Sequence, residues 1–223
     1  MKPLRIARWW ASDYLYAGYG QVRAFLDRRD PSELRTGDAR PVIILPGVWE
    51  TWGFLRPLID VLRAGGHPVH VLPALGRNGR PIPATAEVVS AYLAEHDVRD
   101  VVIVAHSKGG LIGKYVMSRL DPDERVTAMV AVCTPFAGSA YARFMLVPSL
   151  RAFLPTDATT LQLLESLEVN TRITTVAGVW DPHIPAAHEL AGATNITLDD
   201  GGHFRLLASP EVARIVRDVA SRP

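Results

Sequence analysis

The sequence predicts an α/β fold, a mainly parallel sheet flanked by helices, in a single domain covering residues 1–223. From Pro41 onward, short runs of β-branched residues alternate with longer segments of helical periodicity, a pattern typical of βα units. Most of these runs are apolar throughout, as expected for strands that are covered on both faces. A chain of 223 residues, 48% of them hydrophobic, is long enough for one sizeable core and short for two full domains.

The predicted elements follow one another in regular alternation. We expect six strands, each a short apolar or β-branched run, at residues 42–45, 69–72, 101–105, 126–132, 172–177 and 194–198. Between and after them we expect helices at about residues 53–65, 84–96, 108–120, 158–168 and 210–221. Pro210, which follows Ser209, suits the first turn of the last helix, because a proline there forfeits no helical hydrogen bond.

Two segments interrupt this alternation. Residues 76–84 (GRNGRPIPA) form a Gly- and Pro-rich loop without the pattern of a phosphate-binding loop. Residues 136–170 separate two strands by more than an ordinary connection. This second segment contains YARFMLVPSLRAFLP, which is apolar and aromatic and includes Pro148 and Pro155 as helix breakers, so we expect a small cap or lid.

An N-terminal arm, residues 1–36, precedes the alternating part. Its segment RWWASDYLYAGYGQVRAFLDRR is rich in Trp and Tyr, and Gly18 and Gly20 weaken its helical propensity. Because the aromatic residues are interleaved with polar ones, we favour an amphipathic arm that packs on the core. The same composition also fits a membrane interface, so peripheral membrane contact through residues 5–29 stays open.

The charge balance limits the kinds of binding partner that the sequence favours, and the cysteine content bears on the cellular compartment. Lys and Arg total 24 and Asp and Glu 23, so no overall field favours nucleic acid or an acidic partner. The single cysteine, Cys133, cannot form an intrachain disulfide and lies in an apolar run, where a buried thiol is expected. The sequence shows no signal peptide and no run of about 18 apolar residues. We therefore expect a cytoplasmic protein, with membrane association open; the sequence does not indicate the oligomeric state.

A serine stands at the junction of a predicted strand and a predicted helix. In VIVAHSKGGLIGKYV, residues 102–116, the strand-forming run ends near Ala105 and Leu111 begins a helical repeat, so Ser107 falls at the corner. Two interpretations compete: a helix N-cap, and a nucleophile on a strained strand-to-helix turn. The second needs small residues on both sides, because the two backbones approach closely there, and Ala105 and Gly109 meet this demand.

The partners that a nucleophilic serine requires follow in the expected chain order of serine, acid and histidine. Asp181 comes directly after the fifth predicted strand, and His203 follows the last strand in a Gly-flanked loop. Asp199 and Asp200 are alternative acids, which we rank lower because they share the loop of the histidine. We expect Ser107, Asp181 and His203 to be the catalytic residues.

The loop after the first predicted strand offers backbone donors for a developing oxyanion. Gly47, in VIILPGVWETW, lets the chain turn so that the N–H of Val48 faces a ligand. The second expected donor is the N–H of Lys108, at the start of the helix after the serine. If Gly47 is considered without the other motifs, the alternative to an oxyanion loop is an ordinary tight turn after proline. The Lys108 side chain is expected to be solvated at the helix start, or else to favour an anionic substrate.

With these motifs the sequence resembles the α/β-hydrolase superfamily, in particular small lipases and carboxylesterases whose nucleophile elbow reads A-H-S-x-G-G. The resemblance covers roughly residues 40–223 and is most specific at VAHSKGG, LPGVWETWGFL, GVWDPHIP and DGGHF. It implies a parallel-dominated sheet flanked by helices and ester hydrolysis through an acyl-enzyme. Two positions depart from the usual pattern: Ala105 replaces the first glycine of the elbow, as in some of those lipases, and Pro46-Gly47 replaces the usual His-Gly.

Apolar side chains close to these motifs suggest a hydrophobic acyl pocket. We expect Trp49, Trp52 and Phe54, after the oxyanion loop, and Phe144, in the apolar segment 141–154, to bind substrate. Core packing of the same aromatic residues is an equal alternative. The expected partner is a small-molecule ester with an apolar acyl group, and the chemistry requires neither a metal nor an organic cofactor.

The other histidines carry weaker hypotheses. His67 and His70 point to opposite faces of a strand, and His183 and His188 lack an identifiable third ligand, so we expect no metal site. His106 is expected to form structural hydrogen bonds.

Other functions stay open on the sequence alone. An acyltransferase or a thioesterase would use the same three side chains with another acceptor or leaving group. A non-catalytic binding protein that keeps the fold is the alternative from a different class.

Overall fold

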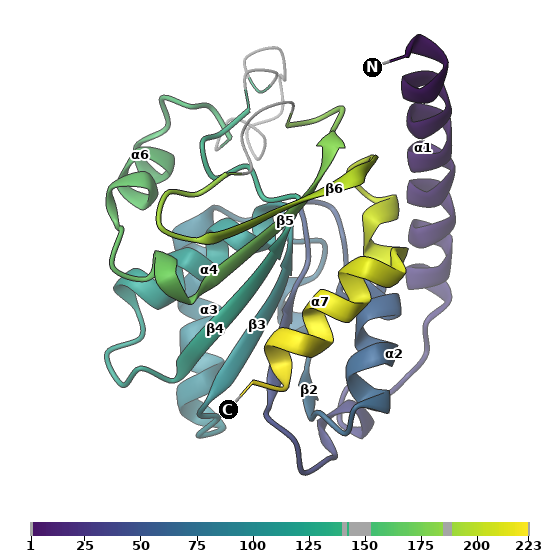
Figure 1. Ribbon diagram of the computed structural model, residues 1–223. Helices are drawn as coiled ribbons and strands as arrows, with labels where there is room; N and C mark the ends of the chain where they lie inside the picture. The colour runs from purple at the N-terminus through teal and green to yellow at the C-terminus, as the bar shows by residue number, and fades with distance from the viewer. Residues whose placement is uncertain (1, 140–141, 143–152, 185–188, 223) are drawn as a thin grey trace.

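In the computed structural model, six parallel strands form one sheet in the order β2-β1-β3-β4-β5-β6 (Figure 1). The structure describes residues 2–139, 142, 153–184 and 189–222. The strands are β1 (Val42–Leu45), β2 (Val69–His70), β3 (Val101–His106), β4 (Val126–Val132), β5 (Ile173–Trp180) and β6 (Thr194–Gly201). The described α-helices are α1 (Pro3–Leu26), α2 (Arg56–Ala64), α3 (Ile82–Glu95), α4 (Lys108–Arg119), α6 (Ala158–Glu165) and α7 (Pro210–Ala220). The predicted α/β class with a parallel sheet is confirmed.

The sheet separates two apolar clusters, because successive side chains of a strand point to opposite faces. Ile43 and Ile103 belong to the cluster that α3 and α4 cover, and Ile44 and Val104 belong to the cluster that α2 and α7 cover. Figure 1 shows these helices on the two sides of the sheet. Both faces of the central strands are therefore buried, which explains why those strands are apolar throughout rather than alternating.

Some strands end at other residues than predicted, because pairing with a neighbouring strand determines how far each one extends. β5 and β6 run on to Trp180 and Gly201, which lie opposite each other, because the two strands continue to pair beyond their apolar runs. Gly178 allows this close pairing, since a Cβ there would lie 2.3 Å from the carbonyl oxygen of Asp200. At the other edge of the sheet, β2 ends at His70 because only two of its residues pair with β1.

Most of the N-terminal arm forms one long helix, α1, which lies against β6 and two 3₁₀ turns, η2 (Trp52–Leu55) and η6 (Arg205–Ala208) (Figure 1). Gly20 faces Phe54 so closely that a Cβ there would lie 2.6 Å from the phenyl ring. The Asp13 carboxylate is fully buried and accepts the N–H groups of Phe204 (2.8 Å) and Arg205 (2.9 Å) at the start of η6. The arm therefore packs on the core, and its glycines do not interrupt the helix.

Only part of the predicted cap, residues 136–170, falls within the described residues. Residues 158–165 form α6, which packs against α4, and Asp157 caps its start by accepting the N–H of Thr159 at 2.9 Å. The apolar stretch 141–154, which suggested a lid, lies mostly outside the described residues. Among the helices that the structure describes, none has the length and hydropathy needed to cross a bilayer.

Candidate active site

Ser107 occupies a strained corner between β3 and α4. Its φ of 50° and ψ of −120° fall in a region that residues other than glycine rarely adopt. An N-cap residue has extended backbone angles and its side-chain oxygen accepts a backbone N–H of the first turn, but the Ser107 side chain makes no such hydrogen bond. The capping interpretation is therefore wrong, and the Ser107 hydroxyl is available for another partner.

The corner requires the small residues that follow the serine. A Cβ on Gly109 would lie 2.1 Å from the carbonyl oxygen of Leu45, and a Cβ on Gly110 would lie 2.1 Å from Oγ1 of Thr134. These contacts are too short for any side chain, so the start of α4 can approach β1 and the end of β4 only with glycines there. Thr134 fixes the corner further by donating its hydroxyl to the Ser107 carbonyl at 3.0 Å.

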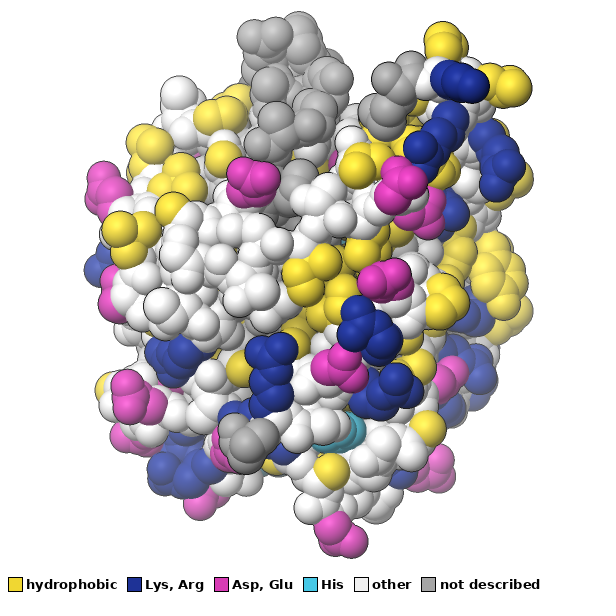
Figure 2. Space-filling view, viewed as in Figure 1, with side chains coloured by type: hydrophobic (Ala, Val, Ile, Leu, Met, Phe, Trp, Pro, Cys, Tyr) yellow, Lys and Arg dark blue, Asp and Glu magenta, His cyan; other side chains and the backbone are white. Residues whose placement is uncertain are grey.

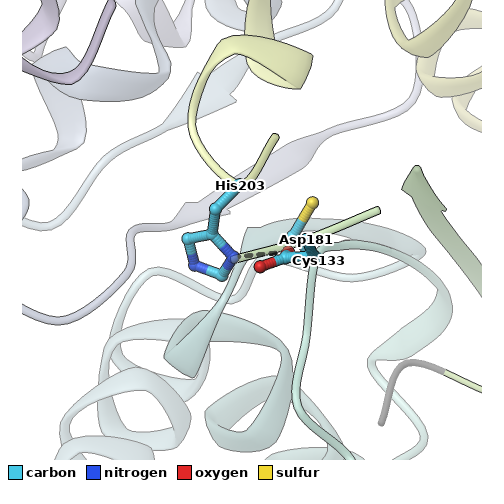
Figure 3. Close-up of side chains that lie close together, drawn as sticks. All are labelled: Cys133, Asp181 and His203. Atoms are coloured by element: carbon cyan, nitrogen blue, oxygen red, sulfur yellow. Dashed lines mark hydrogen bonds and ion pairs between the residues drawn. The ribbon is translucent and has the colours of Figure 1, made fainter. Parts of the chain in front are cut away.

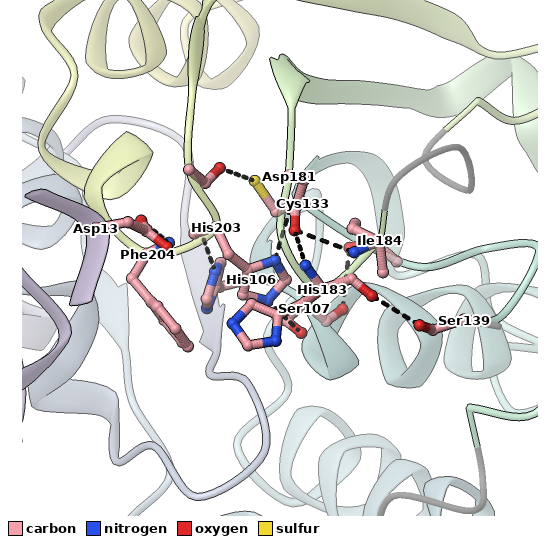
Figure 4. A network of polar contacts seen from close by, with 12 residues as sticks. Asp13, His106, Ser107, Cys133, Ser139, Asp181, His183, Ile184, His203 and Phe204 are labelled. Carbon is pink, nitrogen blue, oxygen red and sulfur yellow. Dashed lines mark hydrogen bonds and ion pairs between the residues drawn. The ribbon is translucent and has the colours of Figure 1, made fainter. Parts of the chain in front are cut away.

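Ser107, His203 and Asp181 form one hydrogen-bonded chain (Figure 4). Oγ of Ser107 lies 3.1 Å from Nε2 of His203, and Nδ1 of His203 lies 2.7 Å from Oδ2 of Asp181. The three residues come from the ends of β3, β5 and β6, which parallel pairing brings to one edge of the sheet. All three are buried, so their mutual hydrogen bonds face little competition from water.

Asp181 and His203 shift each other's pKa in opposite directions. Burial alone raises the pKa of Asp181, but His203 and the backbone N–H groups of His183 (2.7 Å) and Ile184 (3.1 Å) outweigh it, so the pKa is lowered. Burial alone lowers the pKa of His203, but the charge and hydrogen bond of Asp181 outweigh it, so the pKa is raised. The pair is therefore suited to hold a proton on the imidazole beside a carboxylate.

The alternative acids pair with arginines rather than with His203. Asp199 is exposed and pairs with Arg5 of α1 at 2.6 Å. Asp200 pairs with Arg205 at 2.5 Å. The geometry thus selects Asp181 as the acid partner of His203.

Glu50, to which the sequence analysis gave no role, and His106 form a buried support for this chain. Oε2 of Glu50 accepts the N–H of Gly47 at 2.7 Å and lies 2.9 Å from Nδ1 of His106. Nε2 of His106 lies 3.0 Å from the carbonyl oxygen of His203, within hydrogen-bond distance. The expectation of a structural role for His106 is thereby confirmed. The signal for Glu50 is a carboxylate within the aromatic run VWETWGF.

The surroundings of the two expected oxyanion donors, the N–H groups of Val48 and Lys108, are compatible with that role. The N–H of Gly47 is taken by Glu50, whereas Val48 lines the pocket described below. Lys108 is the first residue of α4, where backbone N–H groups have no acceptor within the helix.

The side chain of Lys108 is neither solvated nor directed at a substrate, so both expectations for it are wrong. It is fully buried, and Nζ donates to the carbonyl oxygens of Asn78, at 2.8 Å, and Arg80. Asn78 in turn donates its amide to the carbonyl of Pro46 at 2.7 Å. Burial lowers the pKa of Lys108 to about 8. The lysine thus ties the loop at residues 76–84 to the backbone that precedes Gly47.

A largely apolar pocket of about 150 Å³ opens beside Ser107 and His203. The described residues that line it are Val48, Trp49, Glu50, Ser107, Pro135, Ser139, Ala142, Phe153, His183, Ile184, His203 and Phe204. An apolar cavity next to a nucleophile and a base is the usual form of a small-molecule site.

Of the four predicted substrate-binding residues, the described lining contains only Trp49. Phe54 is fully buried and packs between Gly20 of α1 and the rings of His106 and Phe204, so it belongs to the core. Trp52 is half-buried, with the Arg29 guanidinium over its ring at 5.8 Å, and it lies outside the lining. Phe144 lies outside the described residues.

His183 is a pocket residue that sequence reasoning missed. Its ring lies 4.8 Å from that of His203, and its Nε2 is 3.3 Å from the hydroxyl of Tyr14 on α1. Burial, together with the neighbouring His203, lowers the pKa of His183 to about 4, so its ring is neutral near pH 7. The signal in the sequence is its place two residues after Asp181.

Three potential metal ligands meet at this site: Cys133 Sγ, an Asp181 oxygen and a His203 nitrogen lie within 4.8 Å of one another (Figure 3). The hydrogen bond between Asp181 and His203 already accounts for the approach of two of them. Burial, with the negative charge of Asp181 nearby, raises the pKa of the Cys133 thiol well above its usual range. A neutral thiol is a poor ligand, because metals bind the thiolate.

The fold and this geometry define the class: the chain has the α/β-hydrolase fold. No protein-family model matches it. Among solved structures it is similar to a mature lipase of Bacillus licheniformis, with a TM-score of 0.63 and 14% identity over 88% of this chain and 95% of that one. A monoacylglycerol lipase of Paleococcus ferrophilus gives a TM-score of 0.61 and 14% identity over 83% of this chain and 96% of that one.

The same fold also occurs in proteins named for other chemistry. A haloalkane dehalogenase of Paraglaciecola agarilytica has a TM-score of 0.57 and 15% identity, over 80% of this chain and 83% of that one. The function must therefore be argued from the side chains of the site.

Proposed function

We propose that this protein is a serine hydrolase that cleaves carboxylic esters through an acyl-enzyme on Ser107. The observation that carries the proposal is the hydrogen-bonded chain from Ser107 through His203 to Asp181. A serine hydroxyl becomes a nucleophile when a positioned base accepts its proton and a third group orients that base. The similarity in fold to two lipases supports the ester as substrate.

The reaction proceeds in two proton-balanced halves. As Oγ of Ser107 attacks the ester carbonyl carbon, Nε2 of His203 takes the hydroxyl proton and then passes it to the departing alcohol oxygen. Water next attacks the acyl-enzyme, giving its proton to the same nitrogen, and the proton returns to Oγ as the carboxylic acid leaves. Asp181 keeps its negative charge throughout and stabilises the imidazolium.

The negative charge on the tetrahedral intermediate is assigned to two backbone donors. These are the N–H groups of Val48 and Lys108, each worth about 3 kcal/mol in comparable sites. Glu50 supports the first donor by holding Gly47, and the tie between Lys108 and the Asn78 loop supports both.

The pocket favours an ester with an apolar acyl group. Phe153, Ile184 and Pro135 supply apolar walls, and Trp49 stands at the rim with 43% of its surface exposed. We expect kcat/KM for p-nitrophenyl esters to be higher for a medium acyl chain than for acetate. A steady fall from the acetyl to the octanoyl ester would contradict an apolar acyl site.

A brief exposure to a fluorophosphonate, followed by intact mass and peptide mapping, tests the nucleophile. We expect one adduct on Ser107, absent in Ser107→Ala and formed far more slowly in His203→Ala. The matched control is Ser209→Ala, because Ser209 also precedes a helix without making a capping bond. Absence of an adduct on the folded wild-type protein would overturn the proposal in favour of a non-catalytic binding protein.

A second measurement separates hydrolysis from acyl transfer and from thioester cleavage. Products are analysed with an ester and with its thioester analogue, each with and without an added alcohol acceptor. Ester hydrolysis predicts free acid as the main product with and without the alcohol, formed faster from the ester than from the thioester. A new ester formed at the expense of the acid would identify an acyltransferase instead.

A further inference from the structure

The helix α1 exposes an unusual amount of apolar surface. Eight of the twelve large hydrophobic side chains that the described residues expose lie on this one helix. Leu4, Leu15, Val22 and Phe25 are exposed by 83%, 75%, 60% and 76% and are separated by 11, 7 and 3 residues. These separations place them on one side of a helix, where they form a row, with Arg8 between Leu4 and Leu15, that is called here the α1 ridge.

The polar contacts of α1 lie on the opposite side, toward the protein. Asp13 is fully buried and holds the N–H groups of Phe204 and Arg205, directly after His203 in the chain. Gly20 faces Phe54 on the same side. The orientation of α1 is thus fixed by its contacts with the core, and these contacts leave the α1 ridge facing outward.

The exposed charge of α1 is positive. Within residues 2–26 the cations are Lys2, Arg5, Arg8 and Arg23, and the single acid is Asp13, which is buried. Arg5 is paired with Asp199, which leaves Lys2 and Arg8 exposed near the N-terminal end of the α1 ridge. Figure 2 shows hydrophobic side chains along the edge of the molecule over α1, with Lys and Arg side chains beside them.

Aromatic side chains flank the α1 ridge and connect it to the pocket. Trp10 and Tyr19 are exposed by 53% and 60%, and side chains of this kind favour the boundary between lipid headgroups and acyl chains. Tyr14 contacts His183 in the pocket lining, and Gln21 donates to the carbonyl of Trp49 at the pocket rim. The apolar surface of α1 therefore borders the opening beside Ser107.

We infer that the α1 ridge docks on an anionic lipid surface, with Lys2 and Arg8 at the headgroups and Leu15, Val22 and Phe25 inserted among the acyl chains. Apolar side chains backed by basic ones are the combination that holds a helix in the plane of a membrane interface. A second copy of the chain fits less well, because Arg8 stands within the α1 ridge and a like ridge offers it no acid. Docking would place the opening of the pocket beside the membrane, within reach of molecules dissolved in the lipid.

Vesicle co-sedimentation of the full chain tests this inference. Wild-type protein should bind phosphatidylcholine vesicles that contain phosphatidylglycerol, and less so as salt rises, because screening weakens the charge attraction. The variant L15Q/V22Q/F25Q should bind about tenfold more weakly or worse. Lys2→Gln and Arg8→Gln should each weaken binding about fivefold. The control L161Q/L167Q/V179Q changes three exposed apolar residues elsewhere and should bind as wild type.

The outcomes separate this inference from the proposed catalysis. Ser107→Ala should bind vesicles as the wild type does, because docking requires no nucleophile. Thermal melts of every variant establish that it is folded, which is expected because the substituted side chains are exposed. Wild-type protein that stays in solution, or an L15Q/V22Q/F25Q variant that binds unchanged, would overturn the inference. So would a wild-type dimer, seen by light scattering, that the same variant abolishes.

Discussion

Glu50 and His106 are joined in the protein interior by a hydrogen bond of 2.9 Å between Oε2 and Nδ1, and each also holds the backbone of a different loop of the candidate active site. Glu50 holds Gly47 in the loop after β1, and His106 holds the carbonyl of His203 in the loop after β6. The pair therefore couples the position of the proposed oxyanion donor to that of the proposed base.

Replacing Glu50 by Gln should loosen both loops. A charge-assisted hydrogen bond contributes about 1.5–3 kcal/mol, so we expect the free energy of unfolding in urea to fall by that amount. Misplacement of the Val48 N–H and of His203 should lower kcat/KM about 10–100-fold. Glu87→Gln, at an exposed position of α3, is the matched control and should change neither quantity. Wild-type stability and kcat/KM in Glu50→Gln would show that the pair does not position the site.

The pH dependence of activity should report the interaction of His203 with Asp181. The base must be neutral to accept a proton, and its pKa is raised above the ordinary histidine value of 6.5. The acid limb of kcat/KM should therefore have its midpoint above pH 6.5 in the wild type. In Asp181→Asn the burial of the ring remains and the carboxylate charge is lost, so the midpoint should move to lower pH.

The same substitution should lower kcat about 10³–10⁴-fold, because the imidazole loses the partner that sets its tautomer. Asp200→Asn is the control, since Asp200 pairs with Arg205 instead. An acid limb that stays in place in Asp181→Asn would argue against Asp181 as the charge that raises the pKa of His203.

Gly109→Ala should destabilise the protein through the close approach of α4 to β1. The added methyl group would meet the Leu45 carbonyl at 2.1 Å, and a backbone oxygen cannot move aside cheaply. We expect the free energy of unfolding to fall by about 1–3 kcal/mol. Gly79→Ala is the matched control, because a Cβ there meets nothing within 4 Å. Equal effects of the two substitutions would mean that backbone flexibility, rather than contact, sets the cost.

Lys114→Met should stabilise the protein. The Lys114 ammonium is buried in α4 without a hydrogen-bond partner among the described residues, and burial lowers its pKa to about 8. Removing this buried cation should raise the free energy of unfolding at pH 7 by about 1–2 kcal/mol.

The gain from Lys114→Met should shrink above pH 8. There the folded wild type has lost the Lys114 proton while the unfolded chain still binds it, so wild-type stability rises with pH. Urea titrations of both proteins at pH 7 and pH 9 measure this difference. A loss of stability in Lys114→Met at pH 7 would show that the charge is favourable where it lies.

Cys133 should be inert in the folded protein. Its thiol is fully buried, and burial raises its pKa well above the usual range, so almost no thiolate is present at pH 8. An aromatic disulfide reagent should react with no thiol of the native chain and with one after unfolding in guanidinium. Rapid reaction of the native chain would show that the interior behind Asp181 opens readily.

The strands of the core were predictable because their burial on both faces leaves an uninterrupted apolar run. β1 and β4 match the predicted residues 42–45 and 126–132 at both ends. The ends of β2, β5 and β6 were not predictable in the same way, since they depend on how far a neighbouring strand continues to pair. The local amino-acid composition of a strand does not show how far its neighbouring strand extends.

The residues of the candidate site also fall into two groups, those that the sequence predicted and those that it did not. Ser107, Asp181 and His203 were found because each follows a strand, and parallel strands deliver their carboxyl ends to one edge of the sheet. Glu50 was not assigned a role, because its role depends on a contact with His106, 56 residues away in the chain. The side chain of Lys108 was misjudged for a similar reason, since its burial is set by the loop at Asn78 and Arg80.

By itself the sequence determined the parallel α/β class and the three polar residues at the sheet edge. The hydrophobic pattern and the order of residues along the chain are both visible in the sequence, and these two properties were sufficient. Only the tertiary structure decided which aromatic residues line the pocket, where the Lys108 side chain lies, and which side of α1 faces outward. Those outcomes depend on distances between segments far apart in the chain, and packing alone fixes such distances.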